Sequence, residues 1–100
     1  MQTPMGHELQ YTFVQDFQIA SAFGEKAVKD TYKRVWAEWK DDYKALTEIV
    51  IATNWECWRQ YELGNMKLSE LYSDLYYKSK KYAETHLKGE EFSYYFEMTD

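Results

Sequence analysis

The stretch ALTEIVIATNWECW, residues 45–58, is the most apolar run in the chain of 100 residues, and it holds the single Cys and two of the four Trp. On a helical wheel, its neighbourhood places one mainly apolar stripe at three- and four-residue steps. That stripe consists of Tyr43, Leu46, Val50, Thr53, Asn54, Cys57 and Tyr61, and a second stripe consists of Ile51, Trp55 and Trp58. A helix that is apolar on more than one side is normally covered by several neighbours. We therefore expect a central helix on which the other segments pack.

A strand is the alternative for this stretch, because residues 49–51 are all β-branched. A buried strand is usually bounded by turn residues within about eight positions, but the nearest Gly or Pro residues are Gly24 and Gly64. This spacing favours a helix that ends at Gly64 and is capped at its start by Asp41 or Asp42. Four charged residues between these limits are expected at the surface: Lys44, Glu48, Glu56 and Arg59.

Residues 25–40 form a second helical pattern directly before the central one, with Val28, Tyr32, Val35 and Trp39 on one face. This face keeps phase with the stripe of the central helix, which would suit one continuous helix of about 57 Å at 1.5 Å per residue. Such a length is rare in a small domain. We therefore favour a break near Asp41.

Three further segments complete the predicted fold. Thr12 and Gln15 have the spacing of a capping box, which predicts a helix over residues 13–23 with Phe23 on its apolar side. Residues 65–88 have the cleanest helical periodicity and end at Gly89, and residues 90–96 predict a short C-terminal helix. The sequence thus predicts an all-α single domain over residues 1–100, an irregular bundle of four main helices plus a short fifth, with a loose segment at residues 1–11.

Composition disfavours several classes of function. The 17 acidic and 12 basic residues give a net charge of −5, and nucleic-acid binding usually needs clustered Lys and Arg. One Cys cannot form an internal disulfide, which suits a reducing compartment. The start MQTPMGHELQ lacks the features of a signal peptide, and no apolar run reaches 18 residues. We expect a cytoplasmic protein that does not bind membranes.

No catalytic or cofactor motif is present: the chain has no HExxH, CxxC, EF-hand loop, phosphate-binding Gly-rich loop or GxSxG. His86 lies on the apolar face of residues 65–88, where we interpret it as a packed side chain. Cys57 lies on the central apolar stripe, where thiols are usually inert. We therefore predict no enzyme activity and no cofactor. A small enzyme or metal protein that uses His86, with Cys57 beside it, is the alternative.

Residues 76–88 are rich in lysine and tyrosine, and this is the nearest approach to a basic and aromatic patch. Lys78, Lys80, Lys81 and Lys88 lie there with three tyrosines. Stacking rings and ammonium groups can hold a single nucleic-acid strand, so a nucleic-acid-binding accessory protein that uses the Lys78 to Lys88 face is a second alternative. The lysines spread around the predicted helix, however, and a solvated face is the simpler interpretation.

The aromatic content of 19%, with 10 Tyr and 4 Trp, is the unusual feature of the composition. A rich core is one explanation. Trp and Tyr are also enriched as anchors of protein interfaces, and several rings exceed what the predicted packing faces need. We predict that these rings contact a protein partner or a second copy of the chain: Trp36, Trp58, Tyr77, Tyr94 and Tyr95.

The runs YTFVQDFQIASAFG, DTYKRVWAEWKDDYKALTEIVIATNWECW and LKGEEFSYYF resemble small uncharacterised proteins of bacteriophages and mobile elements from gut Gram-positive bacteria. The resemblance covers residues 11–100. That family has no assigned activity, so no functional residue carries over from it. It implies an accessory protein of a mobile genome, acting in the cytoplasm of a host bacterium. Such proteins often bind and redirect a host protein, including components of defence systems.

Overall fold

A computed structural model describes residues 12–99 of the chain, and within that range it contains five helices and no strand. They are α1 (Thr12–Phe23), α2 (Glu25–Trp39), α3 (Tyr43–Glu62), α4 (Met66–His86) and α5 (Glu90–Thr99). The predicted all-α bundle of four main helices and a short fifth is confirmed. The predicted loose segment at residues 1–11 lies outside the described residues.

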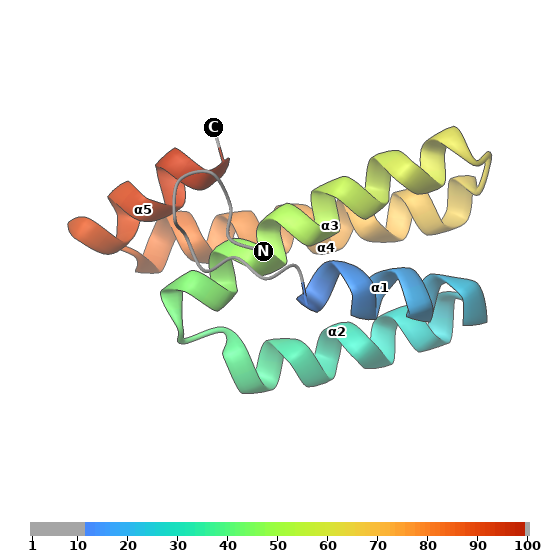
Figure 1. The fold of residues 1–100 in the computed structure, drawn as a ribbon, viewed down its shortest axis with the longest axis horizontal. Helices are drawn as coiled ribbons and strands as arrows, with labels where there is room; N and C mark the ends of the chain where they lie inside the picture. Colours follow the sequence, from blue (N-terminus) through green and yellow to red (C-terminus); the bar gives the residue numbers. More distant parts are fainter. Residues whose placement is uncertain (1–11, 100) are drawn as a thin grey trace.

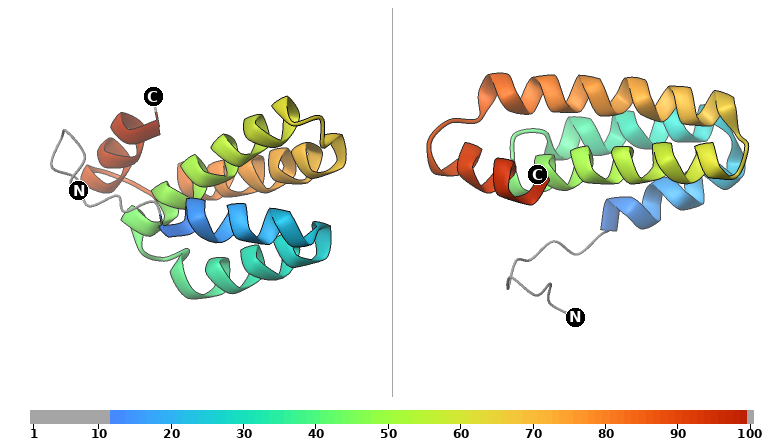
Figure 2. Two further views of the ribbon diagram at one scale, coloured as in Figure 1. Left: turned by 45° about the vertical axis from the view of Figure 1, so that its right-hand side comes forward. Right: turned by 90° about the horizontal axis from the view of Figure 1, so that it is seen from above.

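The helices form two hairpins that pack on each other (Figure 1). α1 and α2 run antiparallel in one hairpin, and α3 and α4 run antiparallel in the other. α5 turns back after α4 and lies against the beginning of α3, as both views in Figure 2 show. α3 contacts α1, α4 and α5, so it is the central helix that the sequence predicts.

The predicted break before the central helix is confirmed at residues 40–42, where α2 and α3 separate. Asp42 has an extended backbone, and its Oδ1 accepts hydrogen bonds from the backbone N–H groups of Lys44 (3.0 Å) and Ala45 (3.2 Å). These bonds satisfy N–H groups that the helix itself cannot pair. At the other end, Gly64 has a φ of 84°, which glycine adopts at low cost.

The core consists of two apolar clusters that meet at the half-buried Trp36. The larger cluster joins α1, α2, α3 and α4 around Phe17 and Tyr72, and the smaller joins α3, α4 and α5 around Leu46. Every residue from 46 to 53 of α3 is buried. This eight-residue part of α3 is therefore enclosed on all sides.

Two carboxylates that the sequence places at the surface are buried instead. Glu48 is 7% exposed, and its Oε2 accepts a hydrogen bond from the backbone N–H of Phe13 at 2.9 Å. Glu48 of α3 therefore caps the start of α1. Thr12 is itself the first residue of this helix, so the predicted cap at Thr12 is wrong. Burial raises the pKa of Glu48, the Phe13 N–H offsets part of the rise, and the charge of Asp16 adds to it.

Glu56 is 1% exposed and lies within a hydrogen-bond network. Its carboxylate accepts hydrogen bonds from Arg59 Nε (2.9 Å) and Nη2 (2.8 Å), from Gln60 Nε2 (2.9 Å) and from Ser21 Oγ of α1 (2.9 Å). Burial raises the pKa of Glu56, but these bonds outweigh it and hold the pKa below its usual value. A carboxylate with this many donors is stable without solvent.

At the ends of two helices, a residue that the sequence assigns to an apolar packing face is exposed. Phe23 is 79% exposed, and Trp39 is also exposed although its ring lies 6.1 Å from that of Phe13. Each is the last residue of its helix. The apolar stripes of α1 and α2 therefore extend past the region where neighbouring helices cover them.

Candidate functional site

The five aromatic residues predicted to contact a partner have different environments. Trp58 and Tyr77 are 60% and 62% exposed. Trp36 and Tyr94 are half-buried, and Tyr95 is 3% exposed within the smaller core cluster. The side chain of Tyr95 therefore contributes to packing, and Trp58 and Tyr77 are the two that the surface presents most fully.

Trp58 borders a groove between α3 and α4, which we call the Trp58 groove. Its volume is about 430 Å³, and it is lined by Cys57, Trp58, Tyr61, Ser69, Glu70 and Ser73. The rings of Trp58 and Tyr61 meet edge to face with their centroids 6.0 Å apart, and Tyr61 is 54% exposed. A groove of this size, with large rings at its edge, can accept an apolar side chain of another molecule.

The rings are exposed because the cover over α3 ends before they begin. α5 covers the first half of α3: the ring of Tyr94 meets that of Tyr43 edge to face at 5.4 Å, and Tyr95 packs with Leu46 and Val50. Beyond residue 53, no helix within residues 12–99 covers the side of α3 that carries Trp58 in this way, whereas the opposite side still packs inward. The sequence pattern does not reveal this difference between the two halves.

The floor of the groove is fixed by a reciprocal contact between α3 and α4. Cys57 Sγ donates a hydrogen bond to the backbone carbonyl of Ser69 at 3.3 Å, and Ser69 Oγ donates one to the backbone carbonyl of Cys57 at 3.0 Å. Cys57 is half-buried. It lies in a different pocket from His86, so the structure does not bring together the predicted pair of Cys57 and His86.

Further apolar side chains extend the surface along α4 and α5. Met66, Glu70, Ser73 and Tyr77 follow one another at helical steps on one face of α4, and Met66 and Tyr77 are exposed. Past Tyr77 this face reaches a second cavity of about 330 Å³ between α4 and α5, where four rings gather. They are Tyr76, Phe92, Tyr95 and Phe96. The sequence analysis selected Tyr77 and Tyr95 as contact residues here, but not Phe92 or Phe96.

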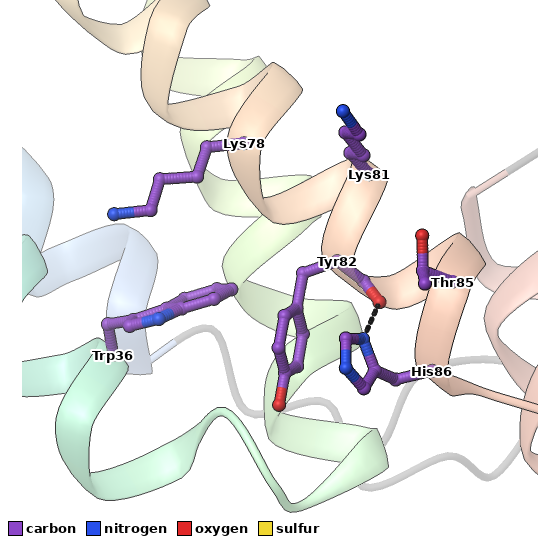
Figure 3. A pocket seen from close by; sticks show the side chains of 6 residues that line it. All are labelled: Trp36, Lys78, Lys81, Tyr82, Thr85 and His86. Atoms are coloured by element: carbon purple, nitrogen blue, oxygen red, sulfur yellow. Dashed lines mark hydrogen bonds between the residues drawn. The ribbon is translucent and has the colours of Figure 1, made fainter.

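His86 lies in a separate pocket between α2 and α4, which we call the Trp36 pocket (Figure 3). It is lined by Trp36, Lys78, Lys81, Tyr82, Thr85 and His86 and has a volume of about 370 Å³. His86 is exposed, so the prediction of a side chain packed in the apolar face is wrong. Its ring stacks on Tyr82 with centroids 3.9 Å apart, and its Nδ1 lies 2.9 Å from the Tyr82 carbonyl. This local stacking holds the ring at the surface.

The lysines of the predicted basic face are divided between two sites. Lys78 and Lys81 line the Trp36 pocket, whereas Lys80 lines the cavity between α4 and α5. The Nζ atom of Lys80 lies 4.0 Å from Oε2 of Glu84. Lys88 follows the end of α4 and lines neither. A continuous basic track for a nucleic-acid strand is therefore not formed by these four residues.

Comparisons of the chain with models of protein families, with characterised proteins and with solved structures gave no match. Among residues 12–99, no three His, Cys, Asp or Glu side chains are grouped closely enough to hold a metal ion. No helix in the same range combines the length and apolar character that a membrane span requires. The geometry of the surface is therefore the feature of the molecule that bears on its function.

Proposed function

We propose that this protein is a non-enzymatic binding module that attaches to another protein through the Trp58 groove. The observation that supports this most directly is the exposure of Trp58 and Tyr61 beside a groove of about 430 Å³. Trp and Tyr are the residue types that most often dominate binding energy at interfaces. The fixed floor formed by Cys57 and Ser69 lowers the conformational cost of binding.

The partner is a different protein that presents an apolar side chain flanked by basic residues. Glu70 lines the groove, which has no basic residue in its lining, and the chain carries a net charge of −5. A second copy would place the same acidic groove against itself, and like charges at an interface oppose association. A basic partner gains from the same charges.

The resemblance to proteins of bacteriophages and mobile elements supports a host or phage protein as this partner. In this proposal the chain acts in the host cytoplasm as an accessory factor, for example as an inhibitor of a defence system. No enzyme activity and no cofactor enter the proposal, because attachment alone is enough to block or redirect another protein.

The test compares Trp58→Ala with Phe23→Ala, which removes another exposed aromatic ring that lines none of the three cavities described above. A binding protein isolated from the native host with the wild-type chain is purified, and its affinity for each variant is measured by calorimetry. We expect Trp58→Ala to weaken binding by at least about 30-fold, the effect of an interface hot spot of about 2 kcal/mol. Phe23→Ala should bind as the wild type does.

Circular dichroism and light scattering complete the test. Unchanged helicity of Trp58→Ala would show that the loss arises at the surface. Equal binding by Trp58→Ala and the wild type would contradict the proposal, and so would an equal loss in Phe23→Ala. A wild-type dimer that Trp58→Ala converts to a monomer would instead identify a second copy as the occupant of the groove and overturn the proposed partner.

A further inference from the structure

The Trp36 pocket differs from the Trp58 groove in the charge of its lining. Its charged residues are Lys78 and Lys81, and no carboxylate is among its lining residues. His86 adds an imidazole ring. This is an unusual composition on a chain with a net charge of −5. The pocket therefore favours an anionic ligand in a molecule whose overall charge disfavours one.

The two ammonium groups at this pocket are not neutralised within residues 12–99. No Asp or Glu oxygen of the described chain lies within 4.0 Å of Lys78 or Lys81, although five other ion pairs are present there. Lys78 Nζ lies over the ring of Tyr32 at 5.4 Å and over that of Trp36 at 5.8 Å. Figure 3 shows Lys78 extended above the indole of Trp36. Its charge is positioned by rings and stays available to a ligand.

The aromatic walls of the pocket are held in place from several directions. The ring of Trp36 stacks on that of Tyr32 at 5.4 Å and meets the ring of Tyr82 edge to face at 5.0 Å. The hydroxyl group of Tyr82 donates a hydrogen bond to Asp41 Oδ1 at 3.2 Å. The imidazole ring of His86 stacks on the ring of Tyr82. A site with fixed walls loses little freedom when a ligand enters.

The contact between His86 and a backbone carbonyl determines which of its ring nitrogens faces a ligand. The Nδ1 atom of His86 lies 2.9 Å from a backbone carbonyl, which can only accept, so Nδ1 carries a proton and donates. Nε2 is then the nitrogen left for a ligand. Thr85 adds a hydroxyl group, which Figure 3 shows on the same side of α4 as Lys81. The rim thus offers two ammonium groups and a hydroxyl group as donors.

We propose that the Trp36 pocket binds a single nucleotide. The flat base lies against the aromatic walls, where stacking does not depend on which base is present. The phosphate accepts hydrogen bonds from Lys78 and Lys81, and from the hydroxyl group of Thr85. A volume of about 370 Å³ lies near the lower end of the usual range of ligand pockets, which suits one small molecule. The site is independent of the Trp58 groove.

The experiment is a titration of the full chain with adenosine monophosphate, followed by the indole N–H signals of the four Trp in NMR spectra. We expect the Trp36 signal to move and the Trp58 signal to stay. Lys78→Met and Lys81→Met should each weaken binding by about tenfold, which corresponds to one charge-assisted hydrogen bond. Lys67→Met is the matched control, because Lys67 is an exposed lysine of α4 that lines none of the three cavities described above.

Other ligands separate the parts of the site. Adenosine, which lacks the phosphate, should bind at least about tenfold more weakly, and cytidine monophosphate should bind with an affinity within about tenfold of that of adenosine monophosphate. A short single strand that bound much more tightly than the free nucleotide would make a strand, not a nucleotide, the ligand. The proposal is overturned by a Trp36 signal that does not move at millimolar adenosine monophosphate, by equal binding of adenosine, or by an equal loss in Lys67→Met.

Discussion

The two halves of α3 belong to one continuous helix, yet their surroundings are opposite. From residue 46 to residue 53 every side chain is buried, including the carboxylate of Glu48. From residue 54 onward only one side faces inward, and Trp58 and Tyr61 project from the other. Residues 43–52 contain seven apolar residues and residues 53–62 contain four, but three of those four are the large rings Trp55, Trp58 and Tyr61. The exposure of these rings shows that hydrophobicity alone does not decide which residues form a core, because a large ring stays at the surface where neighbouring helices do not cover it.

Truncation of one large side chain in each half should give the widest contrast in stability. Ile49→Ala removes a fully buried side chain and leaves a cavity, so it should lower the free energy of unfolding by about 2–5 kcal/mol. Trp58→Ala removes a larger side chain from the exposed half and should cost less than about 0.5 kcal/mol. Urea unfolding followed by circular dichroism measures both values. A large cost for Trp58→Ala would mean that its ring is part of the core.

The buried carboxylates of α3 should respond in opposite directions to the same isosteric change. Glu56→Gln places an amide group against the donors of Arg59 and should cost about 1–3 kcal/mol at pH 7. Glu48→Gln keeps an oxygen for the N–H of Phe13 and removes a buried charge, so it should stabilise the fold by less than about 1 kcal/mol. Urea unfolding of both variants at pH 7 tests this. Changes of the same sign would show that the two environments are alike.

The pH dependence of stability should show the same contrast with a smaller effect. The pKa of Glu56 is lowered in the fold, so its contribution is present above pH 4.5 and is lost as the pH falls through the lowered pKa. The pKa of Glu48 is raised, so its contribution is present below pH 4.5 and is lost as the pH rises through the raised pKa. We expect the wild-type free energy of unfolding to fall below pH 4.5, and this fall should be smaller in Glu56→Gln because the variant lacks the titrating carboxylate. The measurement is urea unfolding at a series of pH values on both sides of 4.5. In Glu48→Gln, the part of the fall in unfolding free energy above pH 4.5 that comes from Glu48 should be absent. If both variants had the same pH profile as the wild type, the lowered pKa of Glu56 and the raised pKa of Glu48 would both be contradicted.

Most helix boundaries are predictable because single residues determine them, and the start of α1, which Glu48 caps from α3, is the exception. Gly24, Gly64 and Gly89 all take positive φ angles, and Asp42 accepts two backbone hydrogen bonds at the start of α3. Each of these effects involves neighbours in sequence, so the pattern alone identifies it. The apolar stripes likewise predict which faces of α2 and α4 point inward.

The environment of a charged residue is harder to predict, because its partners can be far away in sequence. Glu48 pairs with a backbone N–H 35 residues earlier, and no sequence pattern announces such a bond. The partners of Glu56 are partly visible, since Arg59 and Gln60 follow at steps of three and four, but Ser21 is again 35 residues away. The exposure of the second half of α3 is equally hard to predict from the sequence, because it depends on how far α5 covers α3.

The long-range cap on α1 has a consequence for the order in which the fold is assembled during translation. The first helix leaves the ribosome well before the carboxylate that completes its N-terminus, because Phe13 and Glu48 are 35 residues apart. At a synthesis rate of about 5–20 residues per second, the delay is about 2–7 s. The N–H of Phe13 in the nascent N-terminal helix therefore lacks its carboxylate acceptor until residue 48 has been synthesised.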